Sequence, residues 1–173
     1  MPPIISDNAT LLILGSMPGA ESLRLQEYYA YPRNFFWQIL YTLIRVDRDP
    51  WSDSYEQRTD TLCDHGVALW DSLRSCKREG SLDQRIKEQH PNDILGLLEG
   101  YKSISTIFCN GGASYKYFYS YAKDHLRKVS DDHAILFDTI DVYKMPSTSP
   151  VPSKNYRNLE DRLVVWNSRF PVG

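Results

Sequence analysis

Four short apolar segments, each four or five residues long, are spaced along the chain and separated by stretches with helical patterning. The segments are Thr10–Leu14, Val67–Trp70, Ser105–Cys109 and Ala134–Phe137. A short apolar run that ends at a glycine or a polar residue is typical of a strand buried on both faces. Strands that alternate with helices predict a parallel sheet covered on both sides. We therefore expect an α/β fold with three layers, α/β/α, around a central, mainly parallel sheet of four strands.

The helical pattern is clearest after Asn34, because apolar residues recur at spacings of three and four from Phe36 to Leu43. The polar stretch Arg74–Gln89 fits no single pattern, and we predict no element there. Further helices are expected over Tyr55–His65, Asp93–Leu98 with Asn92 as its cap, Ser114–Leu126, and Tyr156–Phe170.

Size and charge limit the possible functions. A chain of 173 residues with 42% hydrophobic residues predicts one domain over residues 1–173. The net charge of −2 gives no overall attraction to nucleic acid, so a DNA contact needs a local basic patch. No apolar stretch reaches the length of a membrane span and no leader precedes the first strand, so we expect a cytoplasmic protein without a membrane partner.

The cysteines and histidines show no metal-binding pattern. Cys63, Cys76 and Cys109 are odd in number and far apart, which argues against a disulfide framework and a zinc site. Cys109 lies in an apolar run and is expected to be a buried, inert thiol. The four histidines lack ligand spacing, so we expect no metal and no cofactor.

Polar groups follow the predicted strands. The loop after Gly15, Asp71, Asn110 and Ser147 all lie at or just beyond a strand end. In open α/β sheets, ligands bind at the carboxyl ends of the strands. These groups are therefore expected to form one site.

The first strand leads into a glycine- and proline-rich loop and then an aromatic segment. The loop, Gly15–Gly19, can present backbone N–H groups to an anion. The segment Tyr28–Trp37 can stack on a flat ring and place the Asn34 amide beside it. A phosphate site next to a ring-stacking site indicates a protein that handles nucleotides.

In this order, the motifs resemble those of the uracil-DNA glycosylase superfamily. The loop Gly15–Gly19 and the segment Tyr29–Trp37 are similar to its first signature region, as in the mismatch-specific branch. Four further motifs are similar to family six, the hypoxanthine-DNA glycosylases: Gly66–Asp71, Ser75–Asp83, Phe108–Gly112 and Met145–Pro150.

The resemblance implies a monofunctional DNA glycosylase of base-excision repair that acts on DNA containing a deaminated base, chiefly deoxyinosine. It assigns catalysis to Asn34 and base reading to Asn110. Tyr29 would stack on the flipped base, and Ser16 and Met17 would shape the loop that faces it. Two methionines, Met17 and Met145, stand where uracil-processing members have polar groups, so excision of uracil by the usual groups is not expected.

Both asparagines have an ordinary structural alternative. Asn34 can hold a water molecule but cannot remove its proton, so we expect slow turnover based on positioning. The alternative for Asn34 is helix capping. The amide of Asn110 can pair with the O6/N1–H edge of hypoxanthine if backbone N–H groups around Gly111 and Gly112 prevent its rotation. The alternative is a plain Asn-Gly-Gly turn.

The proline- and serine-rich loop after Met145 has two interpretations. In the superfamily the matching loop grips phosphates and enters the minor groove, which would assign phosphate contacts to Ser147 and Ser149 and the wedge to Pro150 or Val151. Lys154 adds local positive charge. The alternative is a plain connection to the last helix.

Four functions remain open on the sequence. The first is a monomeric hypoxanthine-DNA glycosylase, and the second is the same fold acting on uracil or other deaminated bases. The third is a noncatalytic nucleic-acid-binding module, because of the two methionines. The fourth is a phosphate-binding hydrolase of free nucleosides, which the acidic net charge favours over a DNA-binding protein.

Overall fold

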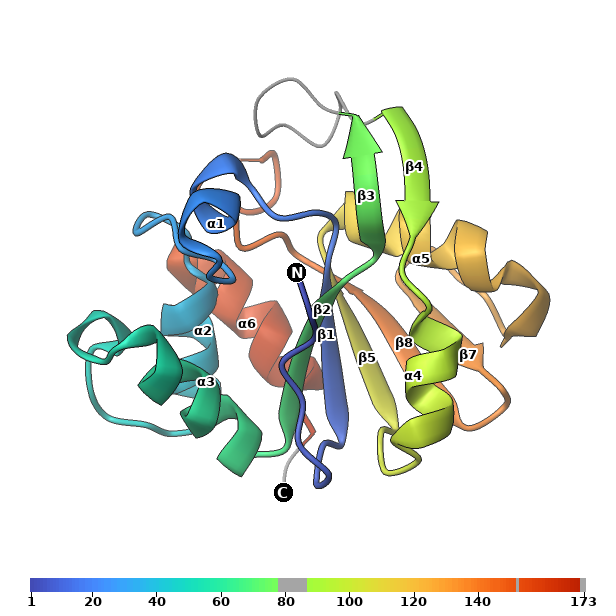
Figure 1. Cartoon of the computed structure of the whole chain (residues 1–173), viewed down its shortest axis with the longest axis horizontal. Helices are drawn as coiled ribbons and strands as arrows, with labels where there is room; N and C mark the ends of the chain where they lie inside the picture. The colour runs from blue at the N-terminus through green and yellow to red at the C-terminus, as the bar shows by residue number, and fades with distance from the viewer. Residues whose placement is uncertain (78–86, 152, 172–173) are drawn as a thin grey trace.

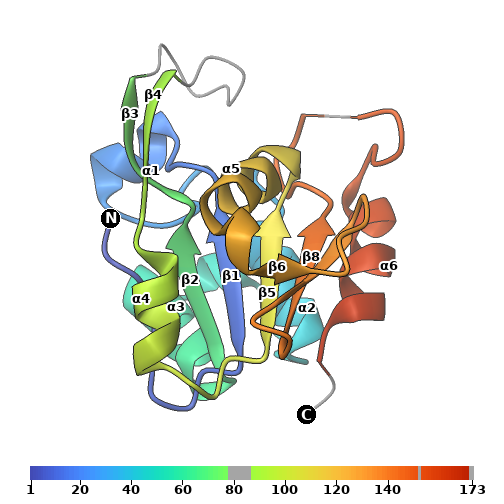
Figure 2. The same cartoon turned by 90° about the vertical axis from the view of Figure 1, so that its right-hand side faces the viewer.

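The computed structural model describes residues 1–77, 87–151 and 153–171. A central sheet has the strand order β2-β1-β5-β8-β7-β6 (Figures 1 and 2). Its strands are β1 (Leu11–Gly15), β2 (Val67–Asp71), β5 (Thr106–Asn110), β6 (Leu126–Arg127), β7 (His133–Leu136) and β8 (Ile140–Met145). Strands β2, β1, β5 and β8 pair in parallel, whereas β7 pairs antiparallel with both β8 and β6. The α/β class and the mainly parallel sheet are confirmed, whereas the predicted count of four strands is wrong because the sheet has six.

The difference arises at the β7–β8 hairpin. The segment predicted as the fourth strand forms β7, which runs antiparallel to its neighbour. The strand that completes the parallel set is β8, which no apolar run marks because its buried residues alternate with partly exposed Asp141, Tyr143 and Lys144. A strand with one mixed face does not produce the continuous apolar pattern of a strand buried on both faces.

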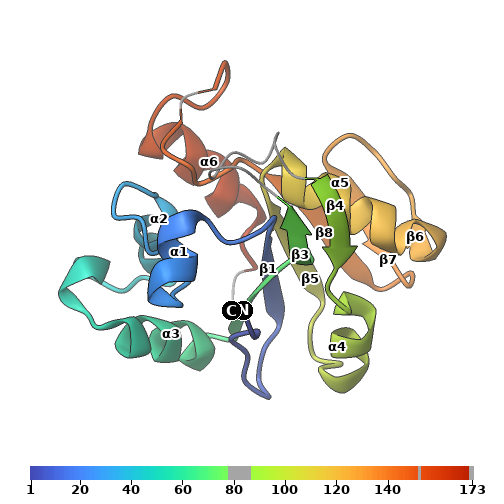
Figure 3. The same ribbon diagram turned by 45° about the horizontal axis from the view of Figure 1, so that its top comes forward.

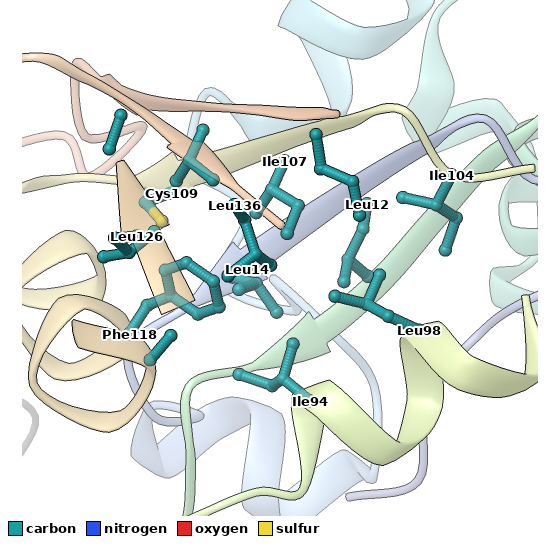
Figure 4. Close-up of a cluster of buried hydrophobic side chains, with 14 of the residues drawn as sticks. Leu12, Leu14, Ile94, Leu98, Ile104, Ile107, Cys109, Phe118, Leu126 and Leu136 are labelled. Carbon is teal, nitrogen blue, oxygen red and sulfur yellow. The ribbon is translucent and has the colours of Figure 1, made fainter. Parts of the chain in front are cut away.

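Helices cover both faces of the sheet. Helices α1 (Ala20–Leu25), α2 (Phe36–Leu43), α3 (Tyr55–Asp64) and α6 (Leu159–Arg169) lie on one side, and α4 (Ile94–Gly100) and α5 (Gly112–Ala122) on the other (Figure 1). Strand β1 is apolar on both faces, which explains the two helical layers. Leu11 and Ile13 pack with α2 and α6. Leu12 and Leu14 face α4 and α5 (Figure 4). The side chains of a strand alternate between faces, so one apolar strand serves two cores.

Two predicted helix boundaries need correction. Helix α5 ends at Ala122, and the residues up to Leu126 form a 3₁₀ turn, η3 (Lys123–His125), and the start of β6. The cap of α4 is Asp93, which accepts the N–H of Gly96, while Asn92 is buried and donates its amide to the carbonyl of Asp71. A short 3₁₀ turn, η1 (Pro50–Ser52), precedes α3.

A separate antiparallel hairpin rises beyond the strand ends (Figure 1). It consists of β3 (Leu73–Lys77) and β4 (Lys87–Pro91), in the stretch for which no element was predicted. Residues 78–83 of the Ser75–Asp83 motif, like Pro152 in the loop after β8, lie outside the described residues.

The first residues of the chain run along the outer edge of β2. The N–H of Ile4 donates to the carbonyl of Leu69, and the N–H of Leu69 donates to the carbonyl of Ile4, at 2.9 and 2.8 Å. The indole N–H of Trp70 also donates to the carbonyl of Met1. The edge strand therefore has backbone partners on both sides at this point. In the described part of the chain, no helix is long and apolar enough to cross a bilayer.

Candidate active site

The parallel strands β2, β1, β5 and β8 have their carboxyl ends at the same edge of the sheet (Figure 2), and this edge is turned toward the viewer in Figure 3. The strand register pairs Gly15 with Asp71 and Asn110 with Met145. The loop after β8, residues 146–151, begins at the same edge. The groups that follow the strands therefore lie near one another, and their function as one site stays a prediction.

The side chain of Asn110 is held by three hydrogen bonds. Its Nδ2 donates to the hydroxyl oxygens of Tyr29 and Thr148 at 3.0 and 2.9 Å, and its Oδ1 accepts the N–H of Thr148 at 2.9 Å. These contacts orient the amide, as base reading requires. The partners differ from the prediction, because the N–H of Gly111 donates to the carbonyl of Met145 instead. The amide oxygen retains one lone pair for a ligand.

Tyr29 connects Asn110 with the aromatic segment. Its ring stacks on Phe36, with ring centroids 3.7 Å apart and planes inclined by 12°. Its backbone has φ of +53°, which is uncommon for a residue with a side chain and is found most often at sites where the surroundings enforce it. Because Phe36 covers one face of the ring, a flipped base can stack only on the other.

Asn34 lies one residue before the N-cap of helix α2, which is Phe35, so the alternative that Asn34 is itself the cap is not confirmed. Its Oδ1 nevertheless accepts the N–H of Phe36, the first residue of the helix, at 3.0 Å, and its own N–H donates to the carbonyl of Tyr31 at 2.8 Å. The side chain is partly exposed. Its Nδ2 and the second lone pair of Oδ1 remain able to bind a ligand or water, so the hydrogen bond to Phe36 does not preclude a role in catalysis.

Thr148 links the two asparagines. Its carbonyl accepts the N–H of Phe35 at 3.0 Å, next to Asn34, while its N–H and hydroxyl bind Asn110. A second connection runs from Asn34 through Phe36 to the ring and hydroxyl of Tyr29. Both connections are chains of contacts between the surroundings of Asn34 and those of Asn110.

Gly15 makes room for the polar groups at the base of this site. A Cβ atom at Gly15 would lie 2.3 Å from Oδ1 of Asp71 and 3.2 Å from the hydroxyl of Tyr29. Asp71 is buried, and it does not cap a helix because the chain continues directly into β3. A buried carboxylate beside Tyr29 is thus part of the site's wall.

The Gly15–Gly19 loop supports the hairpin. The carbonyls of Gly15 and Ser16 accept the N–H groups of Ser72 and Leu73 at 2.8 and 3.1 Å. The side chain of Met17 packs in a small apolar cluster with Leu73 and Tyr117. This cluster gives Met17 a packing role, and its contact with a base stays a prediction. Met145, the other unusual methionine, is buried in the core.

In the loop of residues 146–151, Ser147 and Val151 are exposed and Ser149 and Pro150 are partly exposed, whereas Pro146 and Thr148 are buried. The hydroxyl of Ser147 accepts the N–H of Ser149 at 3.2 Å, and the hydroxyl of Ser149 accepts the N–H of Val151 at 3.4 Å. Val151 is 61% exposed. Lys154, further along, is exposed as well. Pro150 and Val151 form one wall of a cleft of about 610 Å³, whose other residues are Tyr31, Pro32, Arg33, Phe35 and Gln38.

Arg162 of α6 is a site residue that the sequence analysis missed. Its side chain is 1% exposed, and its guanidinium donates to the carbonyls of Ser147, Ser149 and Val151 at 2.7, 3.0 and 3.3 Å. A signal was present, because Arg162 lies three residues after Leu159 and next to Leu163 on the apolar face of the predicted helix. An arginine on such a face needs a buried partner.

Other ionisable groups do not form a metal site. Among the residues that the structure describes, no three histidine, cysteine or acidic side chains cluster as ligands. Cys109 is fully buried, as predicted, and burial raises the pKa of its thiol above the usual value. A thiol with a raised pKa is a poor nucleophile near neutral pH.

Comparison with known proteins decides the family. The model of the Uracil DNA glycosylase superfamily matches residues 2–168. The chain belongs to this superfamily. It is similar to a hypoxanthine DNA glycosylase from Methanosarcina barkeri, with 36% identity over 67% of this chain and 72% of the relative, and to one from Methanosarcina acetivorans, with 35% identity over the same shares.

Solved structures agree with this assignment. A solution NMR structure from Methanosarcina acetivorans, described as that of a candidate uracil DNA glycosylase, superposes with a TM-score of 0.73. The two sequences are 28% identical, and the match covers 97% of this chain and 95% of the other. The uracil-DNA-glycosylase fold therefore extends over nearly the whole chain.

Proposed function

We propose that this protein is a monofunctional DNA glycosylase that hydrolyses the N-glycosidic bond of deoxyinosine in DNA during base-excision repair. The observation that carries the proposal is the pair of oriented amides, Asn34 and Asn110, joined through Thr148 and Tyr29 at one edge of a superfamily fold. The two relatives named hypoxanthine DNA glycosylase support the choice of base.

Base recognition is assigned to Asn110 and Tyr29. The base must first leave the duplex, at a cost of roughly a few kcal/mol. Its N1–H can then donate to the second lone pair of Asn110 Oδ1, and the ring can stack on the face of Tyr29 opposite Phe36. Both hydrogens of Asn110 Nδ2 contact hydroxyl oxygens, so pairing with O6 requires that one of these contacts is shared or opened.

Catalysis is assigned to Asn34, which positions a water molecule below C1′. As the sugar develops positive charge and the base leaves, the carbonyl oxygen of the amide orients this water and stabilises the charge. A carboxamide does not take up a proton near pH 7. We therefore expect slow turnover and a rate that changes little with pH around neutrality.

The loop of residues 146–151 and Lys154 are proposed to contact the DNA. The hydroxyls of Ser147 and Ser149 each retain a proton that can be donated to a phosphate oxygen. Val151, the most exposed apolar side chain of this loop, is proposed as the wedge, with Pro150 beside it. Ser16 and Met17 are proposed to border the flipped nucleotide from the opposite loop.

The decisive experiment is a substrate panel. Labelled duplexes that contain hypoxanthine, uracil or xanthine are incubated with the protein, beside free inosine, and with the variant Asn34→Ala in parallel. Release of hypoxanthine from DNA by the wild type, but not by the variant, supports the proposal. Hydrolysis of free inosine alone would favour a nucleoside hydrolase, and a covalent adduct trapped by borohydride would contradict a monofunctional mechanism.

One observation supports a second candidate function, a noncatalytic nucleic-acid-binding module. Met145 is buried in the core and Met17 packs against the hairpin, so neither methionine performs the role of the polar group that uracil-processing members have at its position. Salt-sensitive binding to DNA without release of any base would identify a noncatalytic module.

We propose that the protein is a single-domain monomer. Its three free cysteines support a reducing compartment such as the cytoplasm.

A further inference from the structure

The loop of residues 146–151 is attached to helix α6 through its carbonyl groups. Alternate carbonyls, those of Ser147, Ser149 and Val151, accept from the Arg162 guanidinium. The carbonyl of Pro146 accepts the indole N–H of Trp166 at 3.0 Å. The carbonyl of Thr148 points the other way, to the N–H of Phe35. The backbone of the loop is thus held from two sides.

Burial of this guanidinium is costly. It lies 5.1 Å from the centre of the Phe35 ring, and its hydrogen-bond partners in the described part of the chain are all backbone carbonyls, including that of Asn158. Desolvation lowers the pKa of Arg162 below its usual value. Its partners are backbone carbonyls, so loss of the guanidinium would leave these acceptors without their donor. The guanidinium is therefore the group that attaches the loop to α6.

We propose that Arg162 is a positioning residue for DNA binding, which fixes the loop of residues 146–151 so that Val151 and the hydroxyls of Ser147 and Ser149 face the duplex. This inference rests on the proposed function and adds a residue to it. By turning the carbonyls inward, the guanidinium keeps these acceptors away from the phosphates, which they would repel.

The shape of the side chain is essential to this role. A guanidinium is planar and has five N–H donors in a fixed arrangement, so it can bind several carbonyls at once. The ammonium of lysine has the same charge but cannot span carbonyls of residues 147, 149 and 151 in one plane. Arg162→Lys thus separates the geometry of the group from its charge.

The test compares Arg162→Lys and Arg162→Met with the wild type. Methionine fills a similar volume without charge or N–H donors, so this second variant removes the attachment of the loop while it keeps most of the packing. Arg169→Lys is the matched control, because Arg169 lies at the far end of α6 and contacts Asp132 and Tyr143. Circular dichroism confirms that each protein is folded at the assay temperature.

Single-turnover excision is measured on two DNAs, a fully paired duplex with hypoxanthine and the same sequence with the hypoxanthine inside an unpaired bubble. Because flipping is cheaper in the bubble, loss of the rigid loop should reduce excision from the duplex by about 10²-fold and affect the bubble much less. Equal losses on both DNAs, or no loss, would overturn the proposal.

Hydrogen–deuterium exchange gives a readout that is independent of activity. Faster exchange in the peptide over residues 146–151 in both Arg162 variants, with unchanged exchange in β1 and β5, is the expected result. Unchanged exchange in that peptide would show that Arg162 does not hold the loop. If the wild type released no base from any DNA, the proposed function would fail, and the exchange result would still decide the role of Arg162.

Discussion

The two asparagines of the site differ in how firmly the protein holds them. Among the residues that the structure describes, the side chain of Asn110 makes three hydrogen bonds, to Tyr29 and Thr148, whereas that of Asn34 makes one, to Phe36. A residue that reads a base needs a fixed orientation, because rotation of the amide exchanges its donor and acceptor. A residue that holds water needs an unoccupied lone pair.

Replacement of Asn34 by alanine separates its two roles. Loss of the hydrogen bond to the first N–H of α2 should cost about 1 kcal/mol of the free energy of unfolding, and loss of the water-holding group should abolish base release. Denaturant unfolding and single-turnover excision measure the two effects. Ser54→Ala is the control, because it removes the cap of α3 away from the site and should lower stability without lowering excision. Excision by Asn34→Ala at the wild-type rate would refute the catalytic role.

Asn110→Asp tests base reading with little effect on the fold. The hydroxyls of Tyr29 and Thr148, which accept from Nδ2, can reverse and donate to a carboxylate oxygen. The variant should therefore remain folded. Its negative charge and the loss of the amide donor should weaken binding of a hypoxanthine-containing duplex, measured by titration at fixed salt. Wild-type affinity and excision would remove Asn110 from base recognition.

The sequence alone identified the polar residues near the strand ends, but it did not identify the residues that hold them in place. Asn34 and Asn110 were placed because each follows a recognisable pattern, an amphipathic helix start and a strand end. Thr148 and Arg162 act through contacts with residues that are distant in the chain. The sequence places Arg162 on the apolar face of a helix, but it does not identify the partners of either residue. For the same reason the partners that orient Asn110 were predicted wrongly.

At the level of elements, the turn between β5 and α5 sets the distance to the loop after β8. Gly111 has φ of +94°, and a Cβ atom there would lie 3.0 Å from the Cβ of Ser147. The neighbouring Gly112 has nothing within 4 Å of the same position. The two glycines therefore offer a matched pair of substitutions.

Gly111→Ala should be destabilised and should displace the loop, because alanine rarely adopts positive φ and its methyl group would crowd Ser147. Gly112→Ala should have near wild-type stability. Thermal unfolding and excision from the duplex measure both consequences. Equal behaviour of the two variants would show that the contact between the turn and the loop is not important.

The prediction of elements followed the strength of the local pattern. Strands β1, β2 and β5 and helices α2 and α6 were predicted near their observed places, since their apolar pattern is strong. Helix α3 was also predicted, although most of its residues are polar. The hairpin β3–β4 and strand β8 were missed, because polar residues on their exposed faces interrupt the pattern. Their pairing depends on neighbours brought by the fold rather than on their own residues.

For the whole molecule, buried tyrosines predict how stability changes in alkali. Burial raises the pKa of Tyr28 and Tyr55, and it raises the pKa of Tyr115 to about 12. A phenol whose pKa is higher in the folded state stabilises the fold below the unfolded value of about 10. This contribution is lost as the pH rises through the folded pKa. The melting temperature should therefore fall between about pH 10 and pH 12, together with a late rise of tyrosinate absorbance. Titration of every tyrosine near pH 10 in the folded protein would contradict this.

The contact between Ile4 and Leu69 affects how readily this protein associates with other copies of itself. An unpaired edge strand can accept a strand of a second chain, and repeated pairing of this kind produces aggregates or fibrils. The N-terminal residues pair with β2 at Leu69 and so block this position of the edge strand. Deletion of these residues should expose the edge of β2 and promote self-association.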